Sequence, residues 1–168
     1  MGRGDVEGGM KFLVDRMLGK LAKGLRMLGY DTIYYQGEDA QQMIQWARQE
    51  DRTILTRNRK LKPKRLEDHI TLIMEDNPSL QLVELVQKGH ISFREENLFS
   101  RCLLCNVLLD EISKEEAEGK VPEFIFHQQK AFFRCPRCQR IYWPGSHLEN
   151  MQKKVEELSQ LQIADRKL

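Results

Sequence analysis

The chain lacks a long apolar segment and an excess of charge of one sign. No apolar run approaches the roughly 20 residues of a membrane-spanning helix, and we find no signal peptide, so we expect a soluble, cytoplasmic protein without a membrane partner. Lys and Arg number 27 against 25 Asp and Glu. Because this near balance says little about partners, the placement of the charges along the chain is the informative property.

Cysteine is scarce, and all of it occurs in two pairs. The four cysteines form Cys102-Leu-Leu-Cys105 and Cys135-Pro-Arg-Cys138, with none left over. Two CxxC turns that face each other supply the four thiolates of a tetrahedral structural zinc site. Disulfides and a thioredoxin-like redox couple are the alternatives. The missing signal peptide disfavours disulfides, and a redox CxxC normally occurs once, at a strand-to-helix junction.

Four thiolates fill the coordination sphere of zinc. Such a metal has no open position for water or substrate, so we expect it to stabilise the protein and the chemistry to lie elsewhere. The residue after each CxxC is expected to adopt a left-handed backbone conformation, which suits Asn106 better than Gln139.

Short β-like runs alternate with helical periods from residue 10 onward. We expect strands at residues 11–14, 32–35, 53–56 and 70–74. Strands that alternate with helices predict an α/β fold with a mostly parallel sheet and helices on both faces.

Three helices are expected between and after these strands. The first spans residues 16–28, where leucines recur at helical spacing, and Gly29 ends it. The second begins after Asp39 as N-cap, with Gln42 completing a capping box. The third begins at Asn77-Pro78 and stops at Gly89.

Polar residues follow the expected strands, at the carboxyl edge where ligands of open α/β sheets gather. Several carboxylates contributed by different strand ends are what Mg²⁺ or Mn²⁺ requires, and such an ion can activate water for attack on a phosphate. An aspartate in the position of Asp39 is more often just a helix cap, and Asp76 is also explained as a solvent-facing loop residue. Asp31 precedes its strand, lies at the opposite edge and is excluded. The candidates are Asp15, Glu38, Asp39, Asn58, Glu75 and Asp76.

Basic residues flank these candidates. One group follows the third strand, where residues 57–65 contain no acidic side chain, and the other lies on the polar face of the first helix. Basic runs are often solvated surface, but beside a carboxylate cluster they favour a polyanionic substrate and hence a nuclease. The candidate RNA-binding residues are Arg16, Lys20, Lys23, Arg57, Arg59, Lys60, Lys62, Lys64 and Arg65.

Four segments together resemble a known family. They are the 11–22 segment KFLVDRMLGKLA, the 25–32 segment LRMLGYDT, the 54–57 segment ILTR and the 142–147 segment YWPGSH. The chain is similar to the PIN-like RNase domain with an attached zinc ribbon, named after the C-terminal region of the exonuclease Mut-seven. The resemblance covers residues 10 to about 151.

The resemblance implies a PIN-like fold, a divalent-metal-dependent RNase activity, and a ribbon built by the four cysteines. Asp15 matches the first acidic position of the family and Asp39 the second. At the third position the family pattern is Leu-Thr-Arg-Asp, but this chain has Asn58. An amide oxygen can still contact a metal, yet it brings no negative charge, so ion affinity should fall.

Two hypotheses of function follow. The first is a metal-dependent endoribonuclease in which Asp15, Asp39 and Asp76 hold Mg²⁺ or Mn²⁺ and Asn58 orients water or metal. The second is an RNA- or partner-binding protein on the same fold, with hydrolysis weakened or lost through Asn58. The expected organisation is a disordered leader at 1–9, a PIN-like nuclease domain at 10–92, a zinc ribbon at 93–148 and an amphipathic helix at 149–168.

The ribbon and the C-terminal segment carry further expectations. Residues 114–118 predict a charged helix, and 124–126 and 131–133 predict a strand pair whose aromatics either form the ribbon core or stack on bases. His127 is expected in solvent or core, and His147 either makes a structural hydrogen bond or contacts substrate. The apolar stripe of the last helix packs on the sheet domain or serves a dimer or protein partner. This stripe consists of Met151, Val155, Leu158 and Leu161.

Overall fold

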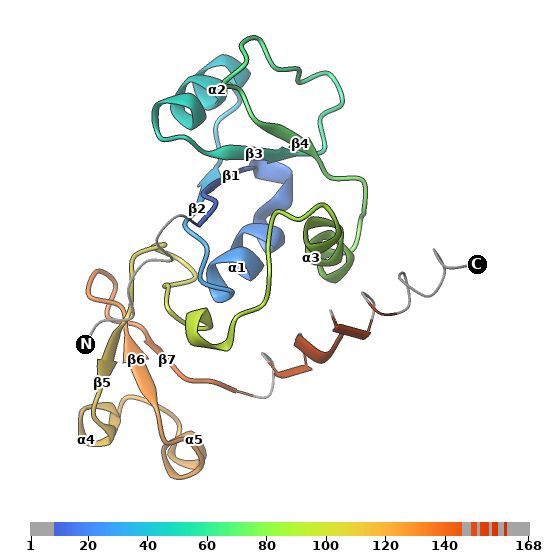
Figure 1. The fold of residues 1–168 in the computed structure, drawn as a ribbon. Coiled ribbons are helices and arrows are strands. Elements are labelled where there is room, and N and C mark those ends of the chain that lie inside the picture. The colour runs from blue at the N-terminus through green and yellow to red at the C-terminus, as the bar shows by residue number, and fades with distance from the viewer. Residues whose placement is uncertain (1–8, 146–148, 151, 155, 158–159, 161–168) are drawn as a thin grey trace.

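The computed structural model describes residues 9–145, 149–150, 152–154, 156–157 and 160 (Figure 1). Its first sheet has four parallel strands in the order β2-β1-β3-β4. Three of the four match the expected positions closely, and β4 is shorter than expected. The strands are β1 (Phe12–Asp15), β2 (Thr32–Tyr35), β3 (Thr53–Thr56) and β4 (Ile70–Leu72).

Helices cover both faces of this sheet, as the sequence predicts. The short 3-10 helix η1 (Arg16–Leu18) leads into α1 (Gly19–Met27), and α3 (Pro78–Gln87) packs beside α1 on one face. Helix α2 (Ala40–Gln49) covers the other face (Figure 1). Strand β1 is central and covered on both sides, so three consecutive apolar residues, 12 to 14, are completely buried.

The helix ends follow the sequence with one correction. Asn77 accepts a hydrogen bond from the backbone N–H of Ser79, and Asp39 accepts bonds from the N–H groups of Gln41 and Gln42. The predicted capping box is wrong in its second half. The Gln42 side-chain oxygen instead lies 3.0 Å from the Tyr35 hydroxyl, which can donate to it or to the Asp39 carbonyl, also at 3.0 Å.

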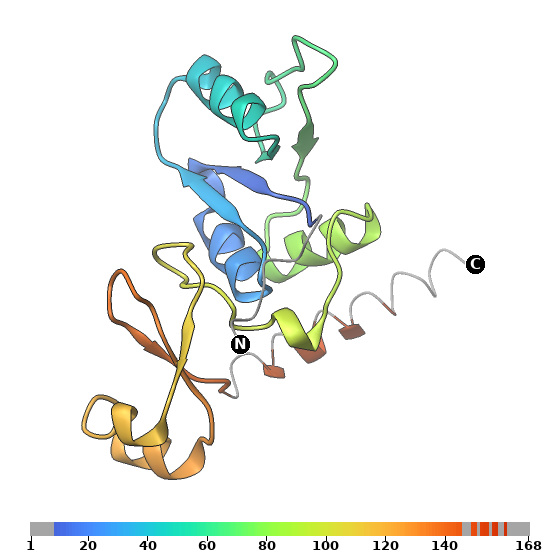
Figure 2. The same cartoon turned by 60° about the vertical axis from the view of Figure 1, so that its left-hand side comes forward.

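A small antiparallel sheet follows the α/β region. Its strands β5 (Asp110–Ile112), β6 (Phe132–Arg134) and β7 (Ile141–Tyr142) lie in the order β5-β6-β7. The 3-10 helix η2 (Glu95–Asn97) precedes this sheet. Helices α4 (Lys114–Ala117) and α5 (Glu123–Gln128) connect β5 to β6 and project away from the larger sheet (Figure 2).

The predicted strand at 124–126 is wrong, because these residues form α5. Ile125 of α5 and Val121, which lies just before the helix, both pack against the core of Ile112, Ala117 and Phe132. The partner of β6 is therefore β5. The charged helix predicted at 114–118 is confirmed as α4, and the side chain of His127 is 66% exposed.

Some expectations fall on residues outside the described part of the chain. They concern residues 1–8 of the expected leader, His147, and the apolar stripe of the last segment; the described residues between 149 and 160 are helical. None of the helices in the described residues is long and apolar enough to span a bilayer.

Candidate functional site: an acidic pocket and a four-cysteine cluster

Asp15 lies at the carboxyl end of the central strand β1, in an open pocket of about 480 Å³. The pocket is formed where β1 and β2 end and α2 begins, the edge at which the sequence predicts a site. It brings Asp15 together with Asn58, as expected, and with Glu38. Met17 and Tyr35 form part of its apolar wall.

The carboxylate of Asp15 is held by two hydrogen bonds. Its Oδ1 accepts from the backbone N–H of Arg16 at 2.7 Å, and its Oδ2 accepts from the Thr56 hydroxyl at 2.8 Å. The Thr56 hydroxyl in turn accepts the backbone N–H of Asn58 at 3.0 Å. Thr56 is fully buried, so it fixes Asp15 and Asn58 relative to each other. Sequence reasoning missed this link because a strand-end threonine has no distinguishing pattern.

Glu38 lines the pocket and pairs with Arg16 at 2.7 Å across its mouth. Both side chains are more than half exposed, so the pair contributes little stability and can open at low cost. The sequence already makes Glu38 a candidate at this edge, and the structure brings it into the pocket beside Asp15.

Two predicted acidic residues lie differently. Asp39 is not part of the pocket lining, and its Oδ1 caps α2, which leaves Oδ2 for other contacts. Asp76 is 93% exposed and pairs with Arg57 at 2.5 Å. Arg57 also donates to the backbone carbonyls of Met74 and Glu75, so it joins the ends of β3 and β4.

The basic segment after β3 is an ordered loop. Asp68, whose side chain is 1% exposed, accepts two hydrogen bonds from Arg48 and one each from the backbone N–H groups of Lys64 and Arg65. The Arg48 guanidinium lowers the pKa of Asp68 to about 2. The loop therefore has an internal anchor, and its remaining cations face outward. These exposed residues are Arg59, Lys60, Lys62, Lys64 and Arg65.

The acidic pocket offers the donor chemistry that Mg²⁺ or Mn²⁺ prefers, namely the oxygens of Asp15, Glu38 and Asn58. Among the described residues, however, no three carboxylates lie close enough to share an ion. The Asn58 side-chain oxygen already accepts the backbone N–H of Lys60 at 3.0 Å. An ion here fits with Asp15 as its main protein ligand and water in several positions, which is common for Mg²⁺.

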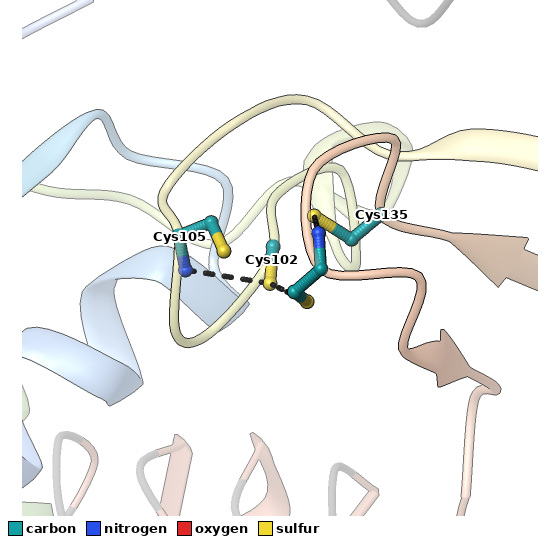
Figure 3. A group of neighbouring side chains, drawn as sticks. Cys102, Cys105 and Cys135 are labelled. Atoms are coloured by element: carbon teal, nitrogen blue, oxygen red, sulfur yellow. Dashed lines mark hydrogen bonds between the residues drawn. The ribbon is translucent and has the colours of Figure 1, made fainter.

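The four cysteines form the second candidate site. Their Sγ atoms all lie within 4.8 Å of one another, and those of Cys102 and Cys138 are 3.7 Å apart. Figure 3 shows three of the four, Cys102, Cys105 and Cys135, close together. Tetrahedral zinc with bonds of about 2.3 Å requires sulfur atoms about 3.8 Å apart. The cluster therefore fits a zinc ribbon, and it is the one metal-compatible group found in the described residues.

We call residues 102–105 the first knuckle and residues 135–138 the second knuckle. In each, the backbone N–H of the second cysteine donates to the sulfur of the first at 3.4 Å. The next residues, Asn106 and Gln139, both have φ of 65°. The left-handed conformation predicted after each CxxC is confirmed.

Cys102 is the thiol most ready to bind metal. Burial alone would raise its pKa, but hydrogen bonds from the Tyr142 hydroxyl and from backbone N–H groups lower the pKa to about 7. Burial raises the pKa of Cys105 to about 12. Since only thiolates bind zinc, occupancy of the cluster should release protons and weaken as the pH falls.

The first knuckle contacts the α/β region through Arg26 of α1. This buried guanidinium donates to the carbonyl oxygens of Leu103 at 2.8 Å and Leu104 at 3.2 Å, and to that of Thr32 at 2.9 Å. One arginine thus joins a helix, the start of β2 and the loop between two cysteines.

Asn106 forms a second junction with the start of β2. Its side-chain oxygen accepts the backbone N–H of Thr32 at 3.0 Å, and its amide donates to Asp31 at 2.7 Å. Asp31 also pairs with Arg52 at 2.8 Å. Burial would raise the pKa of Asp31, but the hydrogen bonds from Arg52 and Asn106 outweigh this and lower it. Asp31 lies at the edge opposite Asp15, as predicted, and it has a structural role there.

Comparison of the chain with family models gives a match. The model of the Mut7-C RNAse domain family matches residues 10–155, which include both candidate sites. Neither the curated proteins nor the solved structures contain a significant match. A family match over most of the chain indicates a ribonuclease-type function with RNA as substrate. The chain belongs to the Mut7-C RNAse domain family.

Proposed function

We propose that this protein is a metal-dependent endoribonuclease that hydrolyses RNA phosphodiester bonds at the Asp15 pocket. The observation that carries the proposal is a carboxylate at the end of the central strand, oriented by a buried threonine and open to a pocket large enough for part of a nucleotide. The family membership supports the ribonuclease part of this assignment. The metal requirement, which the resemblance also implies, and the endonucleolytic mode are part of this proposal.

In this assignment Asp15 and Glu38 are the two carboxylates that hold the metal ion. Asn58, in the loop after β3, lines the same pocket. Bound Mg²⁺ or Mn²⁺ supplies an activated water and neutralises charge that develops on the phosphate. Arg16 releases Glu38 when the exposed pair opens. The second carboxylate predicted from the sequence, Asp39, keeps one free oxygen, and Asp76 lies in the next loop; both stay predictions. Comparison of the cleavage rates of Glu38→Gln and Asp39→Asn shows whether Glu38 or Asp39 acts together with Asp15.

The exposed loop cations are proposed to hold the RNA backbone. Arg59, Lys60, Lys62 and Lys64 form no ion pair with a described residue, so their ammonium and guanidinium groups remain available for phosphates. The loop begins at Asn58, which lines the pocket, and this adjacency places positive charge beside the reacting phosphodiester. Arg57 and Arg65 have carboxylate partners and contribute less.

The four-cysteine cluster is proposed to hold structural zinc. Four thiolates leave no open coordination position, so this metal takes no part in hydrolysis. Its contribution is to fold the small sheet β5–β7, whose own apolar core is limited to a few side chains.

A second function is favoured by one observation, the amide at position 58. Asn58 brings no charge to the pocket, and its oxygen is occupied by Lys60. If two carboxylates hold the catalytic ion too weakly, the protein binds RNA without cutting it. An intermediate outcome is a nuclease that requires high Mn²⁺.

RNA cleavage by the wild-type protein and three variants tests these functions. The variants are Asp15→Ala, Asn58→Asp and, as a matched control, Asp110→Asn on the exposed end of β5. Cleavage of a labelled single-stranded RNA is measured with Mg²⁺, with Mn²⁺ and with neither. We expect Asp15→Ala to lose at least about a hundredfold in rate, since a metal ligand supplies several kcal/mol of transition-state stabilisation.

The outcomes separate the two functions. Metal-dependent cleavage that is lost in Asp15→Ala, retained in Asp110→Asn and raised in Asn58→Asp supports the nuclease. Cleavage that survives in Asp15→Ala places the reaction elsewhere and contradicts the assignment. Tight RNA binding without cleavage by any form supports the binding function.

A further inference from the structure

We propose that a groove along α1 binds a nucleotide of the substrate RNA beyond the cleavage pocket, and that the first knuckle forms its far wall. The inference rests on the proposed function for the identity of the ligand. It gives the four-cysteine region a direct part in substrate binding, in addition to its structural part.

The groove has a volume of about 520 Å³ and a mixed lining. Helix α1 contributes Lys20, Lys23 and Met27, the start of α3 contributes Pro78, and the first knuckle contributes Leu103. Lys154 lies on the outer side. Met27 and Leu103 pack in the same apolar cluster, so the floor where α1 meets the knuckle is apolar.

Helical spacing connects this groove to the cleavage pocket. Met17 lines the pocket, and Lys20, Lys23 and Met27 line the groove. Steps of three or four residues place all four side chains on one face of the η1–α1 segment. At 1.5 Å per residue, the face extends about 15 Å from Met17 to Met27. A single strand that leaves the Asp15 pocket along this face therefore reaches the groove within a few nucleotides.

The charges of the groove match a nucleotide. Three lysines line it and no carboxylate does, and no acidic residue occurs in the sequence between Asp15 and Asp31. Neither Lys20 nor Lys23 pairs with a described residue. Cations around an apolar floor suit a ligand with an anionic backbone and a flat base, which is the chemistry of single-stranded RNA.

The knuckle wall is fixed in position before RNA arrives. Arg26, on the same helix, donates to the Leu103 carbonyl, and the two neighbouring cysteines attach this loop to the metal-compatible cluster. Because the Leu103 backbone is held from both sides, contact with a base costs little ordering entropy.

Binding measurements on the full chain test the groove. The probe is a fluorescein-labelled single-stranded uridine dodecamer, and affinity is read by fluorescence anisotropy at several salt concentrations. An Asp15→Ala background prevents cleavage. The groove variant is Lys20→Ala/Lys23→Ala, and its matched control is Lys120→Ala/Lys130→Ala, two exposed lysines of the small sheet region. The second groove variant is Leu103→Ala. Its matched control is Leu104→Ala, because Leu104 is 48% exposed and does not line the groove.

We expect the double lysine variant to bind about tenfold more weakly, and the slope of log affinity against log salt to fall by about 1.4, because two phosphate contacts are lost. Leu103→Ala should weaken binding about threefold with its zinc content unchanged. The two controls should match the background protein.

Contrary results are distinguishable. Unchanged affinity and salt slope in both groove variants would overturn the RNA groove, and are also expected if the groove holds a protein segment. Equal losses in groove and control variants would mean non-specific charge attraction and would overturn it as well. The proposed function fails separately, if Asp15-intact protein cleaves no RNA.

Discussion

The two knuckles have the same local geometry and different surroundings. In both, the N–H of the residue after the second cysteine donates to the carbonyl of the first cysteine at 2.9 Å, and the same residue has φ of 65°. The first knuckle is attached to the α/β region by Arg26 and Asn106. Arg137 in the second knuckle and Gln139 directly after it are exposed.

The difference separates what a CxxC turn needs from what its neighbours need. The turn needs only a left-handed backbone, which Asn106 and Gln139 both supply. The Asn106 side chain additionally bonds Thr32 and Asp31, whereas that of Gln139 bonds only the nearby Pro136 carbonyl. A short amide at the first position therefore serves the junction, and the second position has no such requirement.

Removal of one cysteine should have the largest effect. We expect Cys138→Ser to lose bound zinc and, with it, about 10 kcal/mol of metal-linked folding free energy. Amides of β5–β7 should then exchange with solvent at least about a hundredfold faster, while β1 and β3 stay protected by their own core. Metal analysis and hydrogen exchange measure this. Retention of zinc with unchanged exchange would contradict the four-cysteine site.

Loss of the central arginine of the junction should follow in size. Arg26→Met leaves the carbonyls of Thr32 and Leu103 without their donor, and we expect the free energy of unfolding to fall by about 3 kcal/mol. The matched change in the second knuckle, Arg137→Met, should stay within about 0.5 kcal/mol. Chemical denaturation compares the two. Equal losses would mean that the first knuckle is no more tightly attached than the second.

The two residues after the knuckles give a smaller contrast. Asn106→Ala should cost about 2 kcal/mol, since Thr32 and Asp31 lose partners in a partly buried junction. Gln139→Ala should cost less than about 0.5 kcal/mol, because the side-chain hydrogen bond of Gln139 to the Pro136 carbonyl is exposed. A double-mutant cycle of Asn106→Ala with Asp31→Ala measures the coupling. Additive effects would show that the Asn106–Asp31 bond contributes nothing.

Glycine at the same two positions should act in opposite directions. Gln139→Gly relieves a left-handed backbone at a residue with little else to lose, and should raise stability by up to about 1 kcal/mol. Asn106→Gly relieves less and removes both side-chain bonds, so it should lower stability. Thermal unfolding of the zinc-loaded proteins shows whether each substitution raises or lowers stability. A gain at position 106 would remove the distinction between the knuckles.

Most of the α/β fold could be predicted from local sequence. The four strands, the leucines of α1 and the stop at Gly29 follow from periodicity and turn chemistry alone. The error at 124–126 arose because three apolar residues in a row carry no period, and the helix there is selected by packing of Ile125 on the ribbon core. Contacts with distant residues decided between strand and helix.

The candidate site was predictable where one residue carries the signal. Asp15 and Asn58 follow buried strands, and the structure brings them into one pocket. The sequence offers both Glu38 and Asp39 in the loop after β2 and cannot tell which of them lines the pocket. Thr56 could not be identified, because its importance depends on a hydrogen bond between strands. The partners of Arg26 in the first knuckle lie more than 70 residues away in sequence, so no local pattern indicates them.

Arg26 also limits how this protein can be rearranged during evolution. A gene fragment that encodes only the α/β region would remove the knuckle carbonyls to which the Arg26 guanidinium donates. A ribbon grafted onto an unrelated domain would carry Asn106 without Asp31, the acceptor of its amide. Domain shuffling works best where few contacts cross a boundary. Here we expect recombination to transmit the nuclease region and its ribbon together, as one heritable unit.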